Sequence, residues 1–432
     1  MSANDRCSRP RKILIICQYF VPYAASVGVV ARVVHLARFL NDCGCEVHIL
    51  TSDGADFGDL GLGDFLSELN ITYLSDPLKK SVQERLLRIG DDPNGSASAG
   101  LSLLRAVKRF LNSFILPDLG IFMVPKYYRT AVTLAKSKEI DTVIVSTPPH
   151  SMQLVGGLLK QRFGERIELV VDYRDSWNAS TIFARKGRFT SRIARRLEEF
   201  TVRRADIITC ASQPMLAKLT RLFPDRTLDD KCLLMMNGYA EQPCPMAAPT
   251  AAEELRIGYF GMANDDDRGY RNVQPLLHVM ALGVAAGLRI RLVFYGSLRL
   301  SRIDIRNFPF VEVHRSVPHG QVLDIMREMD YLLILHTDPS NSDEVITGKF
   351  FDYVRARRPI LCFMPRDAEA VRLAERFQVG AWLDSQTPER ALEALASLKH
   401  RQYPGLLDDR LVSSFSRREQ YAKLYARLAG SA

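Results

Sequence analysis

The strongest constraint on this fold is an alternation of short apolar runs with helical segments, which occurs twice along the chain. In the first half, the run at 13–17 is followed by helical spacing at 29–42 and by another run at 46–51. Strands that alternate with helices form a parallel sheet with helices on both faces. The same pattern predicts further strands at 141–147, 168–173 and 206–210, and helices at 154–162 and 189–204.

The second alternation follows a stretch at 237–253 in which Asn-Gly gives way to Pro, Ala and Thr, a composition typical of linkers. A chain of 432 residues also exceeds the size at which one hydrophobic core keeps growing. We therefore expect an α/β protein of two Rossmann-like, doubly wound domains, which bind ligands at the carboxyl ends of their strands. The strands expected in the second domain are 255–261, 288–296, 311–314, 330–336 and 359–364.

The cysteines and the apolar stretches indicate a cytoplasmic protein. Eight cysteines occur without C-x-x-C spacing, and Cys17, Cys210 and Cys362 lie in apolar runs, so we expect reduced, buried thiols. Residues 13–31 carry no charge and follow Arg11 and Lys12, as in a signal peptide, but their polar and Pro-containing interruptions favour a buried strand and loop. No stretch approaches the roughly 20 apolar residues of a membrane-spanning helix.

Basic charge exceeds acidic charge by 58 − 49 = +9, which would suit a phosphate-bearing ligand or an anionic membrane. Helix 101–116 pairs an apolar face with Arg105, Lys108 and Arg109, and residues 185–204 hold eight basic residues against two Glu. Helix 101–116 either lies on a membrane or packs on its own domain. No stacking-aromatic motif or helix-turn-helix signature accompanies the charge, which argues against nucleic-acid binding.

Nine segments in order along the chain resemble the retaining glycosyltransferases of family 4, which have the GT-B fold. The likeness spans almost the whole chain apart from about residues 55–115. It implies an acceptor-binding domain at 1–236, a linker at 237–253, a nucleotide-sugar-binding domain at 254–410 and a terminal helix at 411–432 that returns to the first domain. The segments are 13–40, 146–164, 170–177, 236–239, 259–277, 292–297, 317–335, 344–361 and 415–428.

The resemblance is most informative at Glu344 and Asp352, two acids eight residues apart. In the family both positions are usually Glu, the first near the donor sugar's hydroxyl groups and the second near the ribose. Carboxylates suit this role because each can accept hydrogen bonds from neighbouring hydroxyl groups. The Asp at 352 is one methylene shorter than the usual Glu. Without the resemblance, such a pair is more often a solvated helix face.

A diphosphate needs positive charge and backbone N–H donors. Lys349 follows Gly348 at an expected helix start and can provide both. Arg268 and Arg271 stand where the family usually places basic diphosphate contacts, although three neighbouring aspartates, 265–267, could pair with them instead. Gly28, in the loop expected after the first strand, would let backbone approach the phosphates or would serve only as a turn.

In the first domain, Asp172 and Asp175 fall at the carboxyl end of the expected strand 168–173. The family often has a polar or acidic residue there that orients the acceptor, so both are candidate catalytic residues together with Glu344. Asp172 could instead pair with Arg174. His150, after two prolines, is a further candidate, although a single histidine is usually structural.

The resemblance therefore implies a retaining hexosyltransferase of polysaccharide biosynthesis, which we expect on the cytoplasmic side and peripheral to the membrane. Its expected partners are a UDP- or GDP-sugar and a glycan or lipid-linked glycan. No cofactor or metal is expected, because no His, Cys or Asp cluster has ligand spacing. Two alternatives stay open, namely a nucleotide-sugar epimerase or hydrolase on the same fold, and a non-catalytic sugar-binding subunit.

Overall fold

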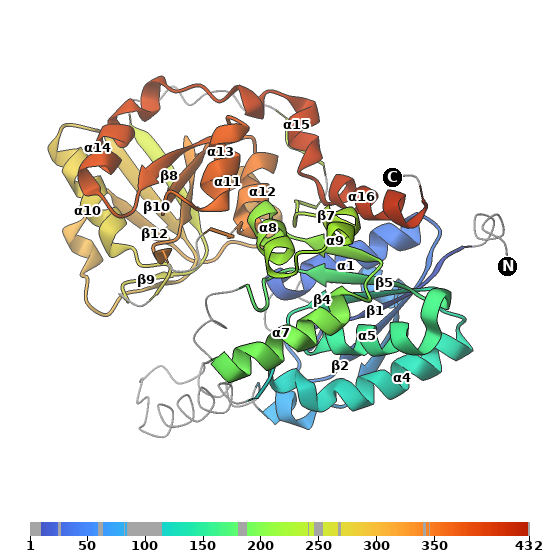
Figure 1. Cartoon of the computed structure of the whole chain (residues 1–432). Helices are drawn as coiled ribbons and strands as arrows, with labels where there is room; N and C mark the ends of the chain where they lie inside the picture. Colours follow the sequence, from blue (N-terminus) through green and yellow to red (C-terminus); the bar gives the residue numbers. More distant parts are fainter. Residues whose placement is uncertain are drawn as a thin grey trace. The chain divides into compact units, whose positions relative to one another are not determined.

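The computed structural model divides the chain into two compact units (Figure 1). It describes residues 10–24, 27–58, 64–81, 83, 115–179, 188–240, 242–245, 254–266, 269–339, 343–344 and 346–430. Unit 1 contains Met1–Ala211, Met215–Met235 and Tyr421–Ala432, and unit 2 contains Ser212–Pro214 and Met236–Gln420. Most of residues 101–116, the predicted amphipathic helix, lie outside the described residues.

Unit 1 is built on a seven-stranded sheet in the order β3-β2-β1-β4-β5-β6-β7. All of its neighbouring strands are parallel, as the alternation predicted. The inner strand β1 is fully buried from Ile13 to Ile16, in agreement with the buried strand predicted there. The strands are β1 (Lys12–Ile16), β2 (Glu46–Ser52), β3 (Asn70–Leu74), β4 (Thr142–Thr147), β5 (Glu168–Tyr173), β6 (Ile207–Cys210) and β7 (Cys232–Leu234).

Helices cover both faces of this sheet because successive strand residues point to opposite sides. Leu14 and Ile16 pack in the core beneath α4 and α5, whereas Ile13 and Ile15 pack in the core beneath α1. Figure 1 shows α4, α5 and α7 lying as one layer on unit 1. The helices are α1 (Val27–Asp42), α4 (Val124–Ser137), α5 (Met152–Phe163), α7 (Arg188–Val202), α8 (Gln213–Leu222) and α9 (Arg226–Lys231).

Unit 2 has a six-stranded parallel sheet in the order β12-β10-β8-β13-β14-β15, with a short β11-β9 pair beside it. Its strands are β8 (Leu255–Phe260), β9 (Ala263–Asn264), β10 (Ile290–Tyr295), β11 (Leu298–Arg299), β12 (Val311–His314), β13 (Tyr331–Leu335), β14 (Ile360–Met364) and β15 (Gly380–Asp384). Its helices are α10 (Gln274–Ala285), α11 (His319–Arg327), α12 (Gly348–Arg355), α13 (Glu369–Arg376) and α14 (Pro388–Ser397).

The end of the chain returns to unit 1, as expected for a terminal crossing helix. Two helices lie near the end of the chain: α15 (Asp409–Ser414) belongs to unit 2, and α16 (Arg417–Leu428) enters unit 1 at Tyr421. Tyr421, Leu424 and Leu428 are buried in the core beneath α1, and the Tyr421 hydroxyl group donates to the Arg32 carbonyl oxygen at 3.1 Å. Within the described residues, no helix is long and apolar enough to cross a membrane.

Candidate functional site

The unit 2 site is centred on Lys349, in the first turn of α12, which begins at Gly348 as predicted. The Lys349 ammonium group lies 3.9 Å from the centre of the Tyr259 ring, a cation–π contact at the end of β8. Burial, and secondarily the nearby charge of Arg271, lower the pKa of Lys349 to about 7. Neither cation forms an ion pair with a carboxylate among the residues that the structure describes. Two neighbouring cations therefore share a half-buried environment in which no described carboxylate pairs with either of them.

Two glycines keep the backbone open beside Lys349. Gly261 directly follows β8 with φ +134°, and Gly296 directly follows β10 with φ +132°, both in the region that favours glycine. A Cβ atom on Gly261 would lie 2.8 Å from the Lys349 Nζ atom, and one on Gly296 would lie 2.4 Å from the Gly261 carbonyl oxygen. A side chain at Gly261 would occupy the space beside the ammonium group, and one at Gly296 would displace the backbone of Gly261.

Polar groups from the neighbouring elements complete the site. Thr347, the residue that precedes α12, has a buried hydroxyl group without a hydrogen-bond partner among the described residues. The same holds for the Nε2 atom of His336, which follows β13 and whose ring centre lies 5.5 Å from that of Tyr270. Buried polar groups normally have partners, so these two atoms fit a site that receives a polar ligand.

The two predicted acids bracket the start of α12. Glu344 lies in the turn before the helix, and Asp352 lies within the helix; both side chains are partly buried. Lys349 lies between the two acids along the chain.

Asp265, one of the three aspartates beside the arginines, has a different role from pairing with them. Asp265 is buried, and its carboxylate accepts hydrogen bonds from the backbone N–H groups of Ser301 at 2.8 Å, Arg302 at 2.5 Å and Ile303 at 3.0 Å. These bonds keep its pKa below the ordinary value although burial acts to raise it. Asp265 therefore anchors the loop after β11 and leaves Arg271 to other contacts. Arg268 lies outside the described residues.

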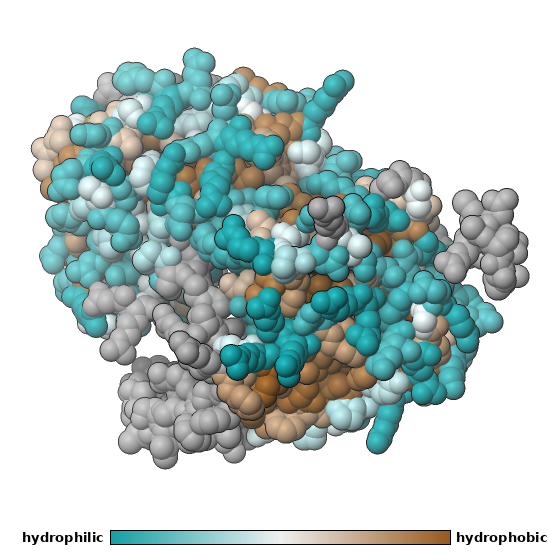
Figure 2. Space-filling model, in the orientation of Figure 1, coloured by the Kyte–Doolittle hydropathy of each residue, from teal (hydrophilic) through white to brown (hydrophobic). Residues whose placement is uncertain are grey.

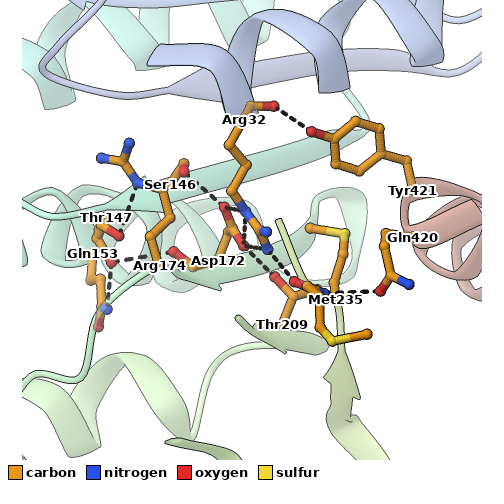
Figure 3. Close-up of polar contacts among 11 residues, drawn as sticks. Arg32, Ser146, Thr147, Gln153, Asp172, Arg174, Thr209, Met235, Gln420 and Tyr421 are labelled. Carbon is orange, nitrogen blue, oxygen red and sulfur yellow. Dashed lines mark hydrogen bonds and ion pairs between the residues drawn. The ribbon is translucent and has the colours of Figure 1, made fainter. Parts of the chain in front are cut away.

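In unit 1 the structure places Asp172 away from the expected ligand-facing position. Its side chain is fully buried and forms an ion pair with Arg32 of α1, in place of the Arg174 pairing considered above (Figure 3). Arg32 Nη2 lies 2.7 Å from Oδ1 and Nε lies 3.0 Å from Oδ2, and the hydroxyl groups of Thr209 and Ser146 donate to the same carboxylate at 2.6 and 2.8 Å. Burial alone would raise the pKa of Asp172, but Arg32 and these bonds hold it below the ordinary value.

Asp175 differs from Asp172 because it lies beyond the strand and is exposed to solvent. The adjacent Arg174 fixes the backbone there by donating to the carbonyl oxygens of Pro148 at 2.7 Å, Thr147 at 3.2 Å and Val29. Asp175 is thus an accessible carboxylate on an anchored segment at the carboxyl end of β5. Such a group can accept hydrogen bonds from a polyhydroxyl ligand.

His150 and Gly28 have structural positions. The His150 ring is buried and stacks on Trp177, with ring centres 5.4 Å apart, and burial followed by Arg174 lowers the pKa of His150 to about 3. Its imidazole is therefore neutral at physiological pH. Gly28, expected in a loop, lies in the exposed first turn of α1, because that helix begins at Val27.

Two buried charged residues of unit 1, Arg32 and Glu198, were not predicted from the sequence. Arg32 is 3% exposed on α1, and Glu198 is 1% exposed on α7. The available signal was a charged residue on the apolar face of each predicted helix, since such residues are almost always paired when buried. No group of three or more His, Cys, Asp or Glu that could hold a metal ion occurs among the described residues.

Comparison with known proteins identifies the fold. Residues 27–228 match the family model described as "Glycosyl transferase 4-like domain". No curated protein sequence matches the chain. The whole chain is similar in structure to the apo form of a lipopolysaccharide outer core galactosyltransferase, with a TM-score of 0.63 at 11% identity, covering 98% of this chain and 100% of that one.

Two further solved structures are also similar to the whole chain. Sucrose-phosphate synthase from Thermosynechococcus elongatus has a TM-score of 0.62 at 14% identity, and a UDP-forming α,α-trehalose-phosphate synthase from Burkholderia vietnamiensis has a TM-score of 0.57 at 10% identity. Each comparison covers 98% of this chain and 100% of the other. The chain therefore has the two-domain GT-B fold of glycosyltransferases, and the predicted fold class is confirmed.

Proposed function

We propose that this protein is a retaining glycosyltransferase that moves a hexose from a UDP- or GDP-sugar to a glycan or lipid-linked glycan. One observation carries the proposal: Lys349 and Arg271 lie close enough for the arginine to lower the pKa of the lysine, beside two glycines and with no carboxylate ion pair among the described residues. An anionic ligand relieves that repulsion, and a nucleoside diphosphate has the charge to do so. The match to a glycosyl transferase 4-like domain supports the same conclusion.

The donor site would use the charges and the backbone of unit 2. Lys349, Arg271 and the N–H groups at the start of α12 stabilise the diphosphate as negative charge develops on it. Glu344 accepts hydrogen bonds from the sugar hydroxyl groups, and Asp352 accepts them from the ribose, as the family resemblance implies. In same-face attack the departing phosphate takes the acceptor's proton, so these side chains act by binding and orienting. We expect no metal or cofactor.

The acceptor would lie against unit 1, with Asp175 orienting its hydroxyl group. Asp172 then acts as a positioning residue, because its carboxylate is committed to Arg32, Ser146 and Thr209. This assignment separates the two aspartates that the sequence grouped together.

A lipid-linked acceptor would bring the protein to an anionic, cytoplasmic membrane surface. Figure 2 shows apolar side chains gathered over α4 and α5 of unit 1. On the neighbouring α7, Phe189 is 75% exposed beside the exposed Arg192, Arg195 and Arg196. Exposed apolar groups flanked by basic residues suit the surface of an anionic bilayer, so we place polysaccharide biosynthesis at the membrane as part of this proposal.

Calorimetry on the full chain tests the donor site with UDP, GDP and their sugar conjugates as probes. Lys349→Met removes the ammonium group and retains an unbranched side chain. A lost charged hydrogen bond costs about 1.5–3 kcal/mol, so we expect a roughly ten- to hundredfold higher Kd for the nucleotide that binds the wild type.

Arg390→Gln provides the control, because it also removes one positive charge from unit 2, at an exposed position on α14. Equal nucleotide affinity in the wild type and in Lys349→Met would move the donor site elsewhere. Incubation with donor alone, followed by analysis of the sugar product, distinguishes transfer from epimerisation and hydrolysis.

A further inference from the structure

We infer that Glu198 is a positioning residue whose carboxyl proton sets the position of segment 174–178, which carries Asp175. The part that Asp175 plays in acceptor binding rests on the proposed function. The proton-dependent anchor does not, because it follows from contacts within unit 1.

Glu198 holds both ends of the segment. Its carboxyl group is buried on α7, and its Oε2 atom accepts hydrogen bonds from Asn178 Nδ2 at 2.7 Å and from the Asn178 backbone N–H at 3.3 Å. Its Oε1 atom lies 3.0 Å from the hydroxyl oxygen of Tyr173, the last residue of β5. Tyr173 precedes the segment and Asn178 closes it, so one side chain fixes the residues on either side of Asp175.

The number of protons in this network does not match an ionised Glu198. The Tyr173 hydroxyl oxygen also lies 3.1 Å from Gln153 Oε1, so one phenolic proton faces two acceptor oxygens. The amide orientation of Gln153 is fixed because its Nε2 atom donates to Thr147 Oγ1 at 3.1 Å, and that hydroxyl group donates to the Asp172 carbonyl oxygen at 3.3 Å. A second proton on Glu198 satisfies every contact: Glu198 donates to Tyr173, and Tyr173 donates to Gln153.

The surroundings favour that proton near neutral pH. Burial raises the pKa of Glu198 to about 7, while the bonds from Asn178 and Tyr173 and the charge of Arg195 on the same helix act to lower it. Among the described residues, the ionisable groups His150 after β4 and Cys210 of β6 also lie near Tyr173. The low pKa of His150, about 3, keeps its ring neutral, so it adds no charge to the network.

Loss of the proton reverses the direction of the Tyr173 hydrogen bond. As pH rises through about 7, Glu198 loses its proton to solvent and becomes a carboxylate that accepts the hydrogen bond of the Tyr173 hydroxyl group, which leaves Gln153 Oε1 without its donor. A buried acceptor without a donor is unfavourable, so the contacts among Gln153, Tyr173 and Asn178 must readjust. Segment 174–178 readjusts with them.

Trp177 reports this change because it lies inside the segment, is fully buried and stacks on His150. The chain has two tryptophans, so Trp382→Phe leaves Trp177 as the single indole. In that background we expect Trp177 fluorescence to titrate with a midpoint near pH 7. Glu198→Gln retains the shape of the side chain but cannot titrate, so its fluorescence should stay constant across the same range.

Glu199→Gln is the matched control, since it removes the neighbouring carboxylate, which pairs with Arg203 near the surface, and should leave the transition intact. If Glu198→Gln fails to fold, Tyr173→Phe tests the proposal instead. This variant loses a hydrogen bond that lowers the Glu198 pKa, so the midpoint of the fluorescence titration should shift to higher pH. A transition that persists in Glu198→Gln, an unshifted midpoint in Tyr173→Phe, or no transition near neutral pH in the parent would overturn the proposal.

An activity measurement separates this inference from the proposed function. With a transferred sugar in hand, kcat/KM should follow the fluorescence titration in the parent and lose that pH dependence in Glu198→Gln. A Glu198-dependent fluorescence transition in a protein that transfers no sugar would refute the proposed function and leave the anchor standing. A parent kcat/KM profile unrelated to the titration would refute the link to Asp175.

Discussion

Asp172→Asn tests whether the buried carboxylate acts in the fold or on a ligand. The substitution preserves the shape of the side chain and removes its charge. The carboxylate accepts hydrogen bonds from four donor groups, namely Nε and Nη2 of Arg32 and the hydroxyl groups of Ser146 and Thr209. An amide has only one acceptor oxygen, so its NH₂ group must face at least one donor of Arg32.

The expected cost follows from burial. Arg32 is 3% exposed, so the asparagine variant leaves a guanidinium charge buried without its counter-ion. Removal of one partner from a buried ion pair typically costs about 3–5 kcal/mol. With a urea m-value of about 3 kcal/mol per M, the unfolding midpoint of unit 1 should fall by roughly 1–1.7 M.

Urea unfolding followed by Trp177 fluorescence in the Trp382→Phe background reports on unit 1. The double variant Arg32→Met, Asp172→Leu removes both charges, and it should unfold at a higher urea concentration than Asp172→Asn, because replacing a buried pair by apolar groups is often close to neutral. If Asp172→Asn unfolded at the wild-type midpoint while sugar transfer was lost, Asp172 would be a ligand-facing group and its role here would be mistaken.

Two further predictions concern unit 2. Glu344→Gln should lower kcat/KM about ten- to hundredfold through the loss of a charged hydrogen-bond acceptor worth roughly 1.5–3 kcal/mol, whereas Glu389→Gln on the exposed start of α14 should not; equal rates in both variants would remove Glu344 from the site. Gly296→Ala should destabilise unit 2 by about 1–3 kcal/mol in urea unfolding followed by Trp382, because its Cβ atom would lie 2.4 Å from a backbone oxygen. Gly320→Ala in α11, where no atom lies within 4 Å of the added Cβ, is its control, and a similar small effect in both would contradict the clash.

The strands that sequence predicted best are those buried on both faces. β4 is buried at every residue, so its apolar run stands out in the sequence. β3 was missed because it is an edge strand of mixed polarity, in which only Leu74 is buried, and nothing in its composition separates it from a loop. β15 was missed because it begins at Gly380, which weakens any strand pattern.

The sequence predicted only those features of the candidate site that depend on residues close together in the chain. The helix start at Gly348 and Lys349 follows from local sequence, since a glycine, a cation and an apolar helix face are neighbours in the chain. The partner of Asp172 does not follow, because Arg32 is 140 residues away and nothing local distinguishes it from Arg174. The role of Asp265 does not follow from the sequence either, since its partners are backbone amides of residues 301–303, which carry no signature in the sequence.

The return of α16 to unit 1 has a consequence for synthesis on the ribosome. The sheet of unit 2 uses only residues 255–384, so all of its strands emerge before the last segment of unit 1 is translated. The core of unit 1 beneath α1 stays incomplete until Tyr421, Leu424 and Leu428 have been translated. Unit 2 can therefore complete its folding first, although unit 1 begins the chain. A message truncated before codon 421 would leave this apolar core exposed, and its product would be a substrate for chaperones and proteases.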